Sequence, residues 1–239
     1  MNEVTTETGV KSNNNVLLMT FGILAILAIA AAGIYFSMNT DEAMEETGSA
    51  VARVNGEEIS QSEYDRSVAQ ITGVYATQGA DPTDPTVIAS VKDQALNTLI
   101  NRRLMSSAAL SAGVTVDDSE VDTEYQTVVT SLGSEEALTT ALSENGMNED
   151  NLRSEIRTDL LINKYLETKL GVSTIVVTDE EIQTAYDTAI SSSESTEEAP
   201  ALADVRDLIS NQLLSEKQQL AINAELERLR QEASIEVLI

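Results

Sequence analysis

The side chains of this chain that could do chemistry are carboxylates. Its 239 residues include 40 Asp and Glu and 14 Lys and Arg, but no His and no Cys. Without Cys there is no thiol nucleophile, disulfide or zinc–thiolate site, and without His there is no imidazole base. The net charge of −26 repels phosphate backbones, which argues against nucleic-acid binding. Acid–base chemistry by paired carboxylates remains to be weighed.

Two adjacent acid pairs, Asp117–Asp118 and Glu180–Glu181, are the obvious candidates for that chemistry. Both stand where helices are expected to begin, and there a carboxylate complements the positive end of the helix dipole. Side chains of adjacent residues also diverge on a helix, so we interpret the pairs as helix caps. The acidic runs at 117–120 and 148–151 lack the spacing and the central Gly of a calcium loop. The sequence predicts no catalytic residue, no metal site and no cofactor.

Soft side chains are the other candidates, because Met and Tyr adapt to varied peptide partners. Tyr75, Met105 and Met147 are the peptide-binding candidates. The alternative is that each fills the core or its boundary, since a helical protein with few aromatic residues needs such fillers.

The N-terminal region carries an uninterrupted apolar stretch from Val16 to Phe36, without a charge between Lys11 and Asp41. A helix of this length spans about 31 Å, the thickness of a bilayer core. We predict a single transmembrane anchor over 16–36, or an uncleaved signal. The alternative is a cleaved signal peptide, since Ala28-Ile29-Ala30 fits a small-x-small cleavage pattern. The flanking charges place a short cytoplasmic tail (1–15) inside and the bulk of the chain outside the cell membrane. Residues 37–49 are a tether.

The remainder, 50–239, is expected to form one mainly helical domain with a small β contribution. Asn55-Gly56 predicts a hairpin between 50–54 and a strand near Ile59. Capping and stop signals predict helices over 61–79, 86–112, 117–132, 134–145, 148–170, 178–190 and 201–233. The β-prone end, 235–239, should pair with 50–54 or with 173–177.

The expected helix 86–112 has apolar residues on more than one face, which predicts that it is the central buried helix. The helix 201–233 carries two rotated apolar stripes. We expect the first stripe to pack against the central helix and the second, with Leu226 and Leu229, against the hairpin. The first stripe contains Val205, Leu208, Ile209, Leu213 and Leu220. Residues 191–200 are a polar linker with nothing to pack.

Four stretches, in this order, resemble the SurA/PrsA/PpiD group of exported foldases, and specifically the SurA N-terminal chaperone domain. The first is Val54-Asn55-Gly56-Glu57-Glu58-Ile59-Ser60 and the second is the leucine pattern from Leu96 to Leu104 with Gly113-Val114. The third is Val177-Thr178-Asp179-Glu180-Glu181-Ile182, and the fourth runs from Asp204-Val205-Arg206 to Ala233. In that family a parvulin-type prolyl isomerase domain sits between the last two stretches. Here the linker 191–200 stands in its place.

The resemblance implies a SurA N-terminal-like multi-helix domain that holds unfolded or newly translocated polypeptides near the translocon, without ATP. The preferred function is therefore a membrane-tethered extracytoplasmic holdase. One alternative is a non-catalytic envelope adaptor of the same fold, and a weaker one is a prolyl isomerase relative with residual activity. The acidic surface has two interpretations as well: a solvated coat, or an attractive surface for basic clients.

Overall fold

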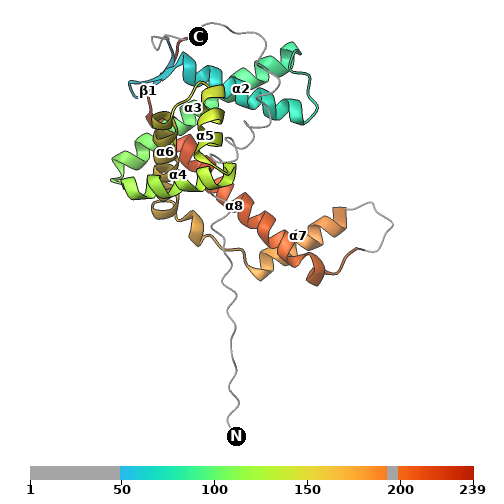
Figure 1. Cartoon of the computed structure of the whole chain (residues 1–239). Coiled ribbons are helices and arrows are strands. Elements are labelled where there is room, and N and C mark those ends of the chain that lie inside the picture. Colours follow the sequence, from blue (N-terminus) through green and yellow to red (C-terminus); the bar gives the residue numbers. More distant parts are fainter. Residues whose placement is uncertain (1–48, 193–198) are drawn as a thin grey trace.

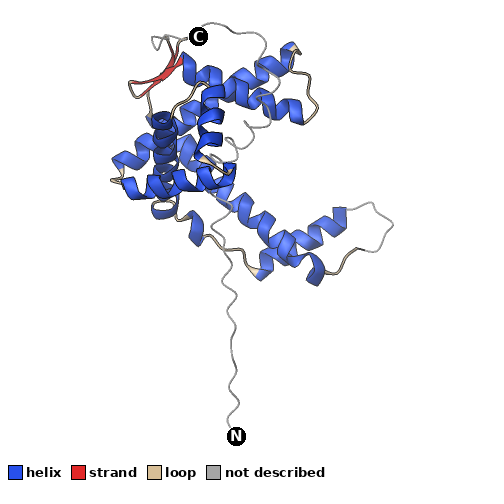
Figure 2. Ribbon diagram, in the orientation of Figure 1, coloured by secondary structure: helices blue, strands red, loops and turns tan. Residues whose placement is uncertain are grey.

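The computed structural model describes residues 49–192 and 199–239. Within these ranges there are seven α-helices and a small three-stranded sheet, which lies at one end of the molecule (Figures 1 and 2). This confirms the mainly helical class with a small β contribution. None of the helices in these ranges has both the length and the apolar character that a membrane crossing requires. The predicted anchor, Val16–Phe36, lies outside the described residues.

The sheet joins the two ends of the described domain. β1 (Ala50–Val54) and β2 (Glu57–Ser60) form the predicted hairpin, and Asn55 and Gly56 both have positive φ (53° and 87°), as a type I′ turn demands. β3 (Ile235–Val237) pairs antiparallel with the other side of β1, which gives the order β2–β1–β3. Of the two pairings left open for the C-terminal segment, the one with 50–54 is correct. Residues 172–174 form a 3₁₀ turn instead.

Helices α2 (Gln61–Thr77) and α3 (Pro85–Ser111) follow the hairpin. Ser60 and Glu63 form the predicted capping box of α2, and Asp84 caps α3 with Pro85 as its first residue. Helix α3 contacts α2, α6, α8 and the hairpin strands. Its predicted central position is confirmed.

Three helices then form a compact group against α3: α4 (Asp118–Leu132), α5 (Glu135–Glu144) and α6 (Glu149–Thr168). Asp117 is the N-cap of α4 and forms a capping box with Glu120, so this acid caps the start of a helix as expected. Gly133, with φ of 93°, ends α4 in the left-handed conformation that glycine adopts at low cost. Helix α6 ends two residues earlier than the predicted Leu170.

The last two helices form an arm that leaves the body. α7 (Asp179–Ser192) lies against the first half of α8 (Leu202–Glu232), and Figure 1 shows this pair projecting beyond the other helices. Residues 191 and 192, predicted as linker, belong to α7. The expectation that the first stripe of α8 packs against α3 is wrong: Val205, Ile209 and Leu213 are half-buried on the α7 side of the molecule. An apolar stripe requires a covering surface, and α7 lies closer along the chain than α3 does.

Three hydrophobic clusters make up the core. The first joins the sheet to α2 and α3, the second lies among α4, α5 and α6, and the third joins α3 to α6. The second half of α8 contributes to two of them, since Leu229 packs against the first and third clusters and Leu226 against the third. The predicted contact of the second stripe with the hairpin region is thus confirmed for Leu229, whereas Leu226 packs against the cluster between α3 and α6. Fully enclosed members of the clusters include Val51, Val54, Ala95, Leu104, Val121, Leu152 and Val172.

Candidate functional site

The three peptide-binding candidates lie in different parts of the fold. Tyr75 is half-buried on α2 and its hydroxyl donates to Gln94 Oε1 of α3 at 3.2 Å. Met105 is buried in the third cluster, and Met147 packs, half-buried, against the second. The structure therefore does not bring them together on one surface. Their role in peptide binding stays a prediction.

Exposed apolar side chains mark other positions, of which the arm carries the largest group. Leu208 and Leu220 on α8 are 69% and 68% exposed, and Ile190 on α7 and Val176 in the preceding loop are exposed too. A second pair, Val74 and Ile88, lies where α2 ends and α3 begins, and a third group is formed by the C-terminal residues Val237, Leu238 and Ile239. The sequence placed Leu208 and Leu220 in a buried stripe, because periodicity does not show how much of a stripe its partner helix covers.

Ion pairs and hydrogen bonds hold the two helices of the arm together. Lys217 of α8 binds Glu181 Oε1 at 2.6 Å and donates to the Val176 carbonyl at 3.0 Å, while Arg206 pairs with Asp179. The hydrogen bond from Lys217, together with the Thr178 backbone N–H, lowers the pKa of Glu181 to about 2. Of the pair Glu180–Glu181, considered for acid–base chemistry, Glu181 therefore has a structural role: it caps α7 and binds α7 to α8.

A buried carboxylate anchors the arm to the body. Glu225 of α8 accepts a 2.5 Å hydrogen bond from the Tyr165 hydroxyl of α6 and is held by Arg228, with Nη2 at 2.6 Å and Nε at 2.9 Å. The hydrogen bonds from Arg228 hold the pKa of Glu225 below its usual value, against the opposing effect of burial. Nearby, Arg230 donates to Asn101 Oδ1 of α3 at 2.7 Å. Sequence reasoning missed Glu225, since its partner Tyr165 is sixty positions away.

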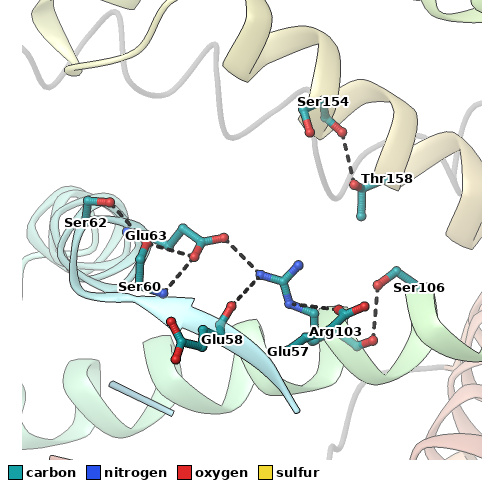
Figure 3. Close-up of polar contacts among 9 residues, drawn as sticks. All are labelled: Glu57, Glu58, Ser60, Ser62, Glu63, Arg103, Ser106, Ser154 and Thr158. Atoms are coloured by element: carbon teal, nitrogen blue, oxygen red, sulfur yellow. Dashed lines mark hydrogen bonds and ion pairs between the residues drawn. The ribbon is translucent and has the colours of Figure 1, made fainter. Parts of the chain in front are cut away.

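A second polar junction, drawn in Figure 3, joins the hairpin to α3 around Arg103. Its guanidinium Nη2 donates to the Glu58 carbonyl at 3.1 Å and lies 3.2 Å from Glu63 Oε1. Glu63 Oε2 accepts from the Ser60 backbone N–H at 2.8 Å, so the cap of α2 and the contact with α3 share one carboxylate. This junction fixes β2 and the start of α2 on α3.

Between α3, α4 and α6, Arg102 forms an ion pair with one carboxylate, and two further acids, Glu155 and Glu124, lie nearby. Arg102 Nη1 lies 2.6 Å from Asp159 Oδ1 and its Nη2 donates to the Glu155 carbonyl at 3.1 Å. Glu124 of α4 adds a third acid, and its Oε1 is buried without a hydrogen-bond partner among the described residues. Burial raises the pKa of all three carboxyls, against the attraction of Arg102 for Asp159 and Glu155. No group of three acids in the described ranges is arranged to hold a metal ion.

Two shallow hollows lie on the outer faces of α4 and α5, and neither lies between α3 and α8. The larger, of about 580 Å³, is lined by Leu132, Ser134, Glu136, Ala137, Thr140, Ala141 and Glu144. The smaller is lined entirely by Thr, Ser and Gln side chains of α4. Their shallow, open form fits a solvated surface better than an enclosed ligand site.

Comparison with known proteins agrees with this arrangement of elements. The family model of the SurA-like N-terminal domain matches residues 10–166, and the chain belongs to this family. The resemblance drawn from the four sequence stretches is therefore confirmed. Only residues 193–201 separate α7 from α8, so no parvulin-type domain is evident between them.

Two curated relatives are both described as "Foldase protein PrsA". The protein from Clostridium kluyveri is 26% identical over 194 residues, which cover 72% of this chain and 56% of that protein. The protein from Caldanaerobacter subterraneus subsp. tengcongensis is 27% identical over 173 residues, which cover 69% of this chain and 51% of that protein. The chain spans about half the length of the curated relatives it matches.

Proposed function

We propose that this chain is a membrane-tethered, ATP-independent chaperone that holds unfolded segments of exported polypeptides outside the cell membrane. Its membership of the SurA-like N-terminal domain family and its PrsA foldase relatives support a folding-assistance role. The observation that carries the proposal is the projecting arm with its exposed Leu208, Leu220, Ile190 and Val176. Such side chains favour contact with the apolar segments that unfolded proteins display.

The acidic surface suits this role as well. Most basic side chains among the described residues form salt bridges with acids, and several of them pair with two acids each. The excess charge is therefore negative over the body and the arm. This negative charge keeps the protein soluble although apolar side chains are exposed, and it attracts basic segments of clients.

The chaperone role is tested by light scattering from a thermally unfolding test protein in the presence of the full chain without ATP. We expect the wild type to suppress aggregation, and the double variant Leu208→Ser/Leu220→Ser to lose at least half of the effect. Leu110→Ser is the matched control, because Leu110 is 61% exposed but lies on α3. All three side chains are solvent-exposed, so melting temperatures should stay close to that of the wild type. Equal suppression by the double variant would exclude the arm as the client surface. Absence of suppression by the wild type would favour the envelope adaptor.

The tether is tested separately by protease protection. The apolar stretch Val16–Phe36 and the charges on either side of it support an extracytoplasmic location for 50–239. In sealed inside-out membrane vesicles we expect this part of the chain to resist added protease until detergent is present. Digestion without detergent would show the opposite orientation.

Isomerase activity is not part of the proposal. Nine positions, 193–201, lie between α7 and α8, and the chain has no His or Cys with which to build a parvulin-like pocket. We expect the full chain not to accelerate prolyl isomerisation in a test peptide. The uncatalysed reaction takes tens of seconds or longer. A clear acceleration would restore the isomerase alternative.

A further inference from the structure

The two edges of the small sheet differ in their contacts with the described residues. With the order β2–β1–β3, the strands β2 and β3 are at the edges. At β2, Arg103 from α3 already binds the Glu58 carbonyl at 3.1 Å (Figure 3). At β3, no strand of residues 49–192 and 199–239 pairs with the outer side. An open edge with free backbone groups is a template for another extended chain.

The backbone of β3 directs alternate residues toward that open side. The Ser234 carbonyl accepts from Asn55 N at 2.8 Å, and Leu238 N donates to the Val51 carbonyl at 2.9 Å. Because hydrogen-bonding directions alternate along a strand, even-numbered residues point to β1 and Ile235, Val237 and Ile239 point away from it. The strand itself, Ile235–Val237, offers an edge of about 10 Å, and the chain continues for two residues beyond it.

The core-facing side of β3 is only partly covered. Ile235 is paired with Val54 and Val237 with Ala52, and both partners on β1 are fully buried. Paired residues share a face of the sheet, so Ile235, Val237 and, by alternation, Ile239 form one apolar row. Ile235 packs against the first cluster, whereas Val237 and Ile239 are 51% and 63% exposed. The row continues beyond the covered part of the core.

The opposite face carries a ladder of alternating charge across all three strands. Arg53 on β1 lies between Glu58 on β2, at 3.0 Å, and Glu236 on β3, at 3.4 Å. A strand added beside β3 would place one of its side chains next to Glu236. A Lys or Arg there would continue the alternation, since opposite charges on neighbouring strands stabilise a pair.

We propose that the outer edge of β3 binds an extended polypeptide segment in which apolar and basic residues alternate. The apolar residues lie beside Val237 and Ile239, the basic residue lies beside Glu236, and the backbone adds a fourth strand to the sheet. This inference rests on the proposed chaperone role and names the class of client segment that this edge accepts. A second copy of the chain does not fit the edge, because two β3 strands would bring their Glu236 carboxylates together and join two chains of net charge −26.

Fluorescence anisotropy with labelled pentapeptides tests the inference on the full chain. We expect Val-Lys-Val-Lys-Val to bind and Val-Glu-Val-Glu-Val to bind about tenfold more weakly or not at all. N-methylation of the pairing amides of the lysine peptide keeps its side chains and removes its backbone donors, and should abolish binding. This arm of the experiment leaves the protein unchanged.

Two variants test the protein side. Val237→Pro removes an N–H that points away from β1, so the strand pairing with β1 is kept while peptide binding falls about tenfold. Glu236→Lys should reverse the preference in favour of the glutamate peptide. Circular dichroism melting checks that both variants are folded.

The outcomes separate this inference from the chaperone role. If the wild type suppresses aggregation but N-methylated and unmodified peptides bind equally well, the β3 edge is not the site and the chaperone role stands. If the wild type neither suppresses aggregation nor binds the lysine peptide, both proposals are wrong.

Discussion

The hydroxyl of Tyr165 donates a 2.5 Å hydrogen bond to Glu225 Oε1, and this contact joins α6 to the middle of α8. Glu225 is buried and also accepts two hydrogen bonds from the Arg228 guanidinium. A carboxylate enclosed in this way is tolerated only because its lone pairs are satisfied. The contact therefore fixes the point at which α8 leaves the body and becomes part of the arm.

Replacing Tyr165 by Phe should lower the free energy of unfolding by about 1.5–3 kcal/mol, the usual contribution of a hydrogen bond to a charged group. The melting temperature should fall by roughly 2–4 °C per kcal/mol for a domain of this size. Tyr75→Phe is the matched control, because its hydrogen bond to Gln94 is solvent-exposed and should contribute less than about 0.5 kcal/mol. Equal effects of the two variants would contradict the special position of Glu225.

The arm should unfold locally before the body does. Ile182 is the buried residue of α7, and its replacement by Ala removes apolar contact at the α7–α8 interface. Hydrogen exchange followed by mass spectrometry should show faster exchange in α7 and in the first turns of α8, with α3 and α6 unchanged. Ile190→Ala, at an exposed position of the same helix, is the control. Loss of protection in α3 as well would show that arm and body unfold together.

The acids around Arg102 make stability depend on pH. Burial raises the pKa of Glu124, Glu155 and Asp159, so the folded state holds protons that the unfolded state has released. Their stabilising effect is complete below the ordinary pKa, 4.5 for Glu124, and is lost as the pH rises through the raised value.

Glu124→Gln tests this dependence, because it removes the charge whose Oε1 lacks a partner. We expect the variant to melt roughly 2–4 °C higher than the wild type at neutral pH and to show a flatter dependence between pH 4.5 and 7.5. Glu144→Gln, at an exposed position of α5, should change neither. A steeper dependence in the Glu124 variant would contradict the assignment.

Local signals in the sequence predicted most of the helix and strand boundaries. Ser60 with Glu63, Asp117 with Glu120 and Asn55-Gly56 act over a few residues, so the pattern alone determines the cap or turn. Contacts between elements that are distant in the sequence were harder to predict. The periodicity of Val205, Ile209 and Leu213 predicts a covered face on α8, but it does not specify whether α3 or α7 covers that face.

The candidate site was harder still to predict. Leu208 and Leu220 satisfy the same periodicity as their half-buried neighbours, so only the width of the contact with α7 shows that they are exposed. Met105 is a soft side chain suited to peptide binding, yet α3 and α6 enclose it. Glu225 and Tyr165 carry no shared local signal, because their contact exists only once α8 has returned to α6.

Leu229 joins the end of α8 to the body. It packs against the first cluster, which includes side chains of β1 and β2, and also against the third cluster, which includes side chains of α6. Leu229→Ala removes contacts from two clusters at once and should lower the free energy of unfolding by about 2–3 kcal/mol. Leu213→Ala lies on the same helix but in the arm, so it should alter hydrogen exchange in α7 and the start of α8 with a smaller effect on global unfolding. Denaturant titration of the full chain measures both variants, and an unchanged slope with a shifted midpoint identifies a pure loss of stability. If Leu213→Ala destabilised global unfolding as much as Leu229→Ala, the arm and the body would be one cooperative unit, and the arm could not change its packing around a client without unfolding the domain.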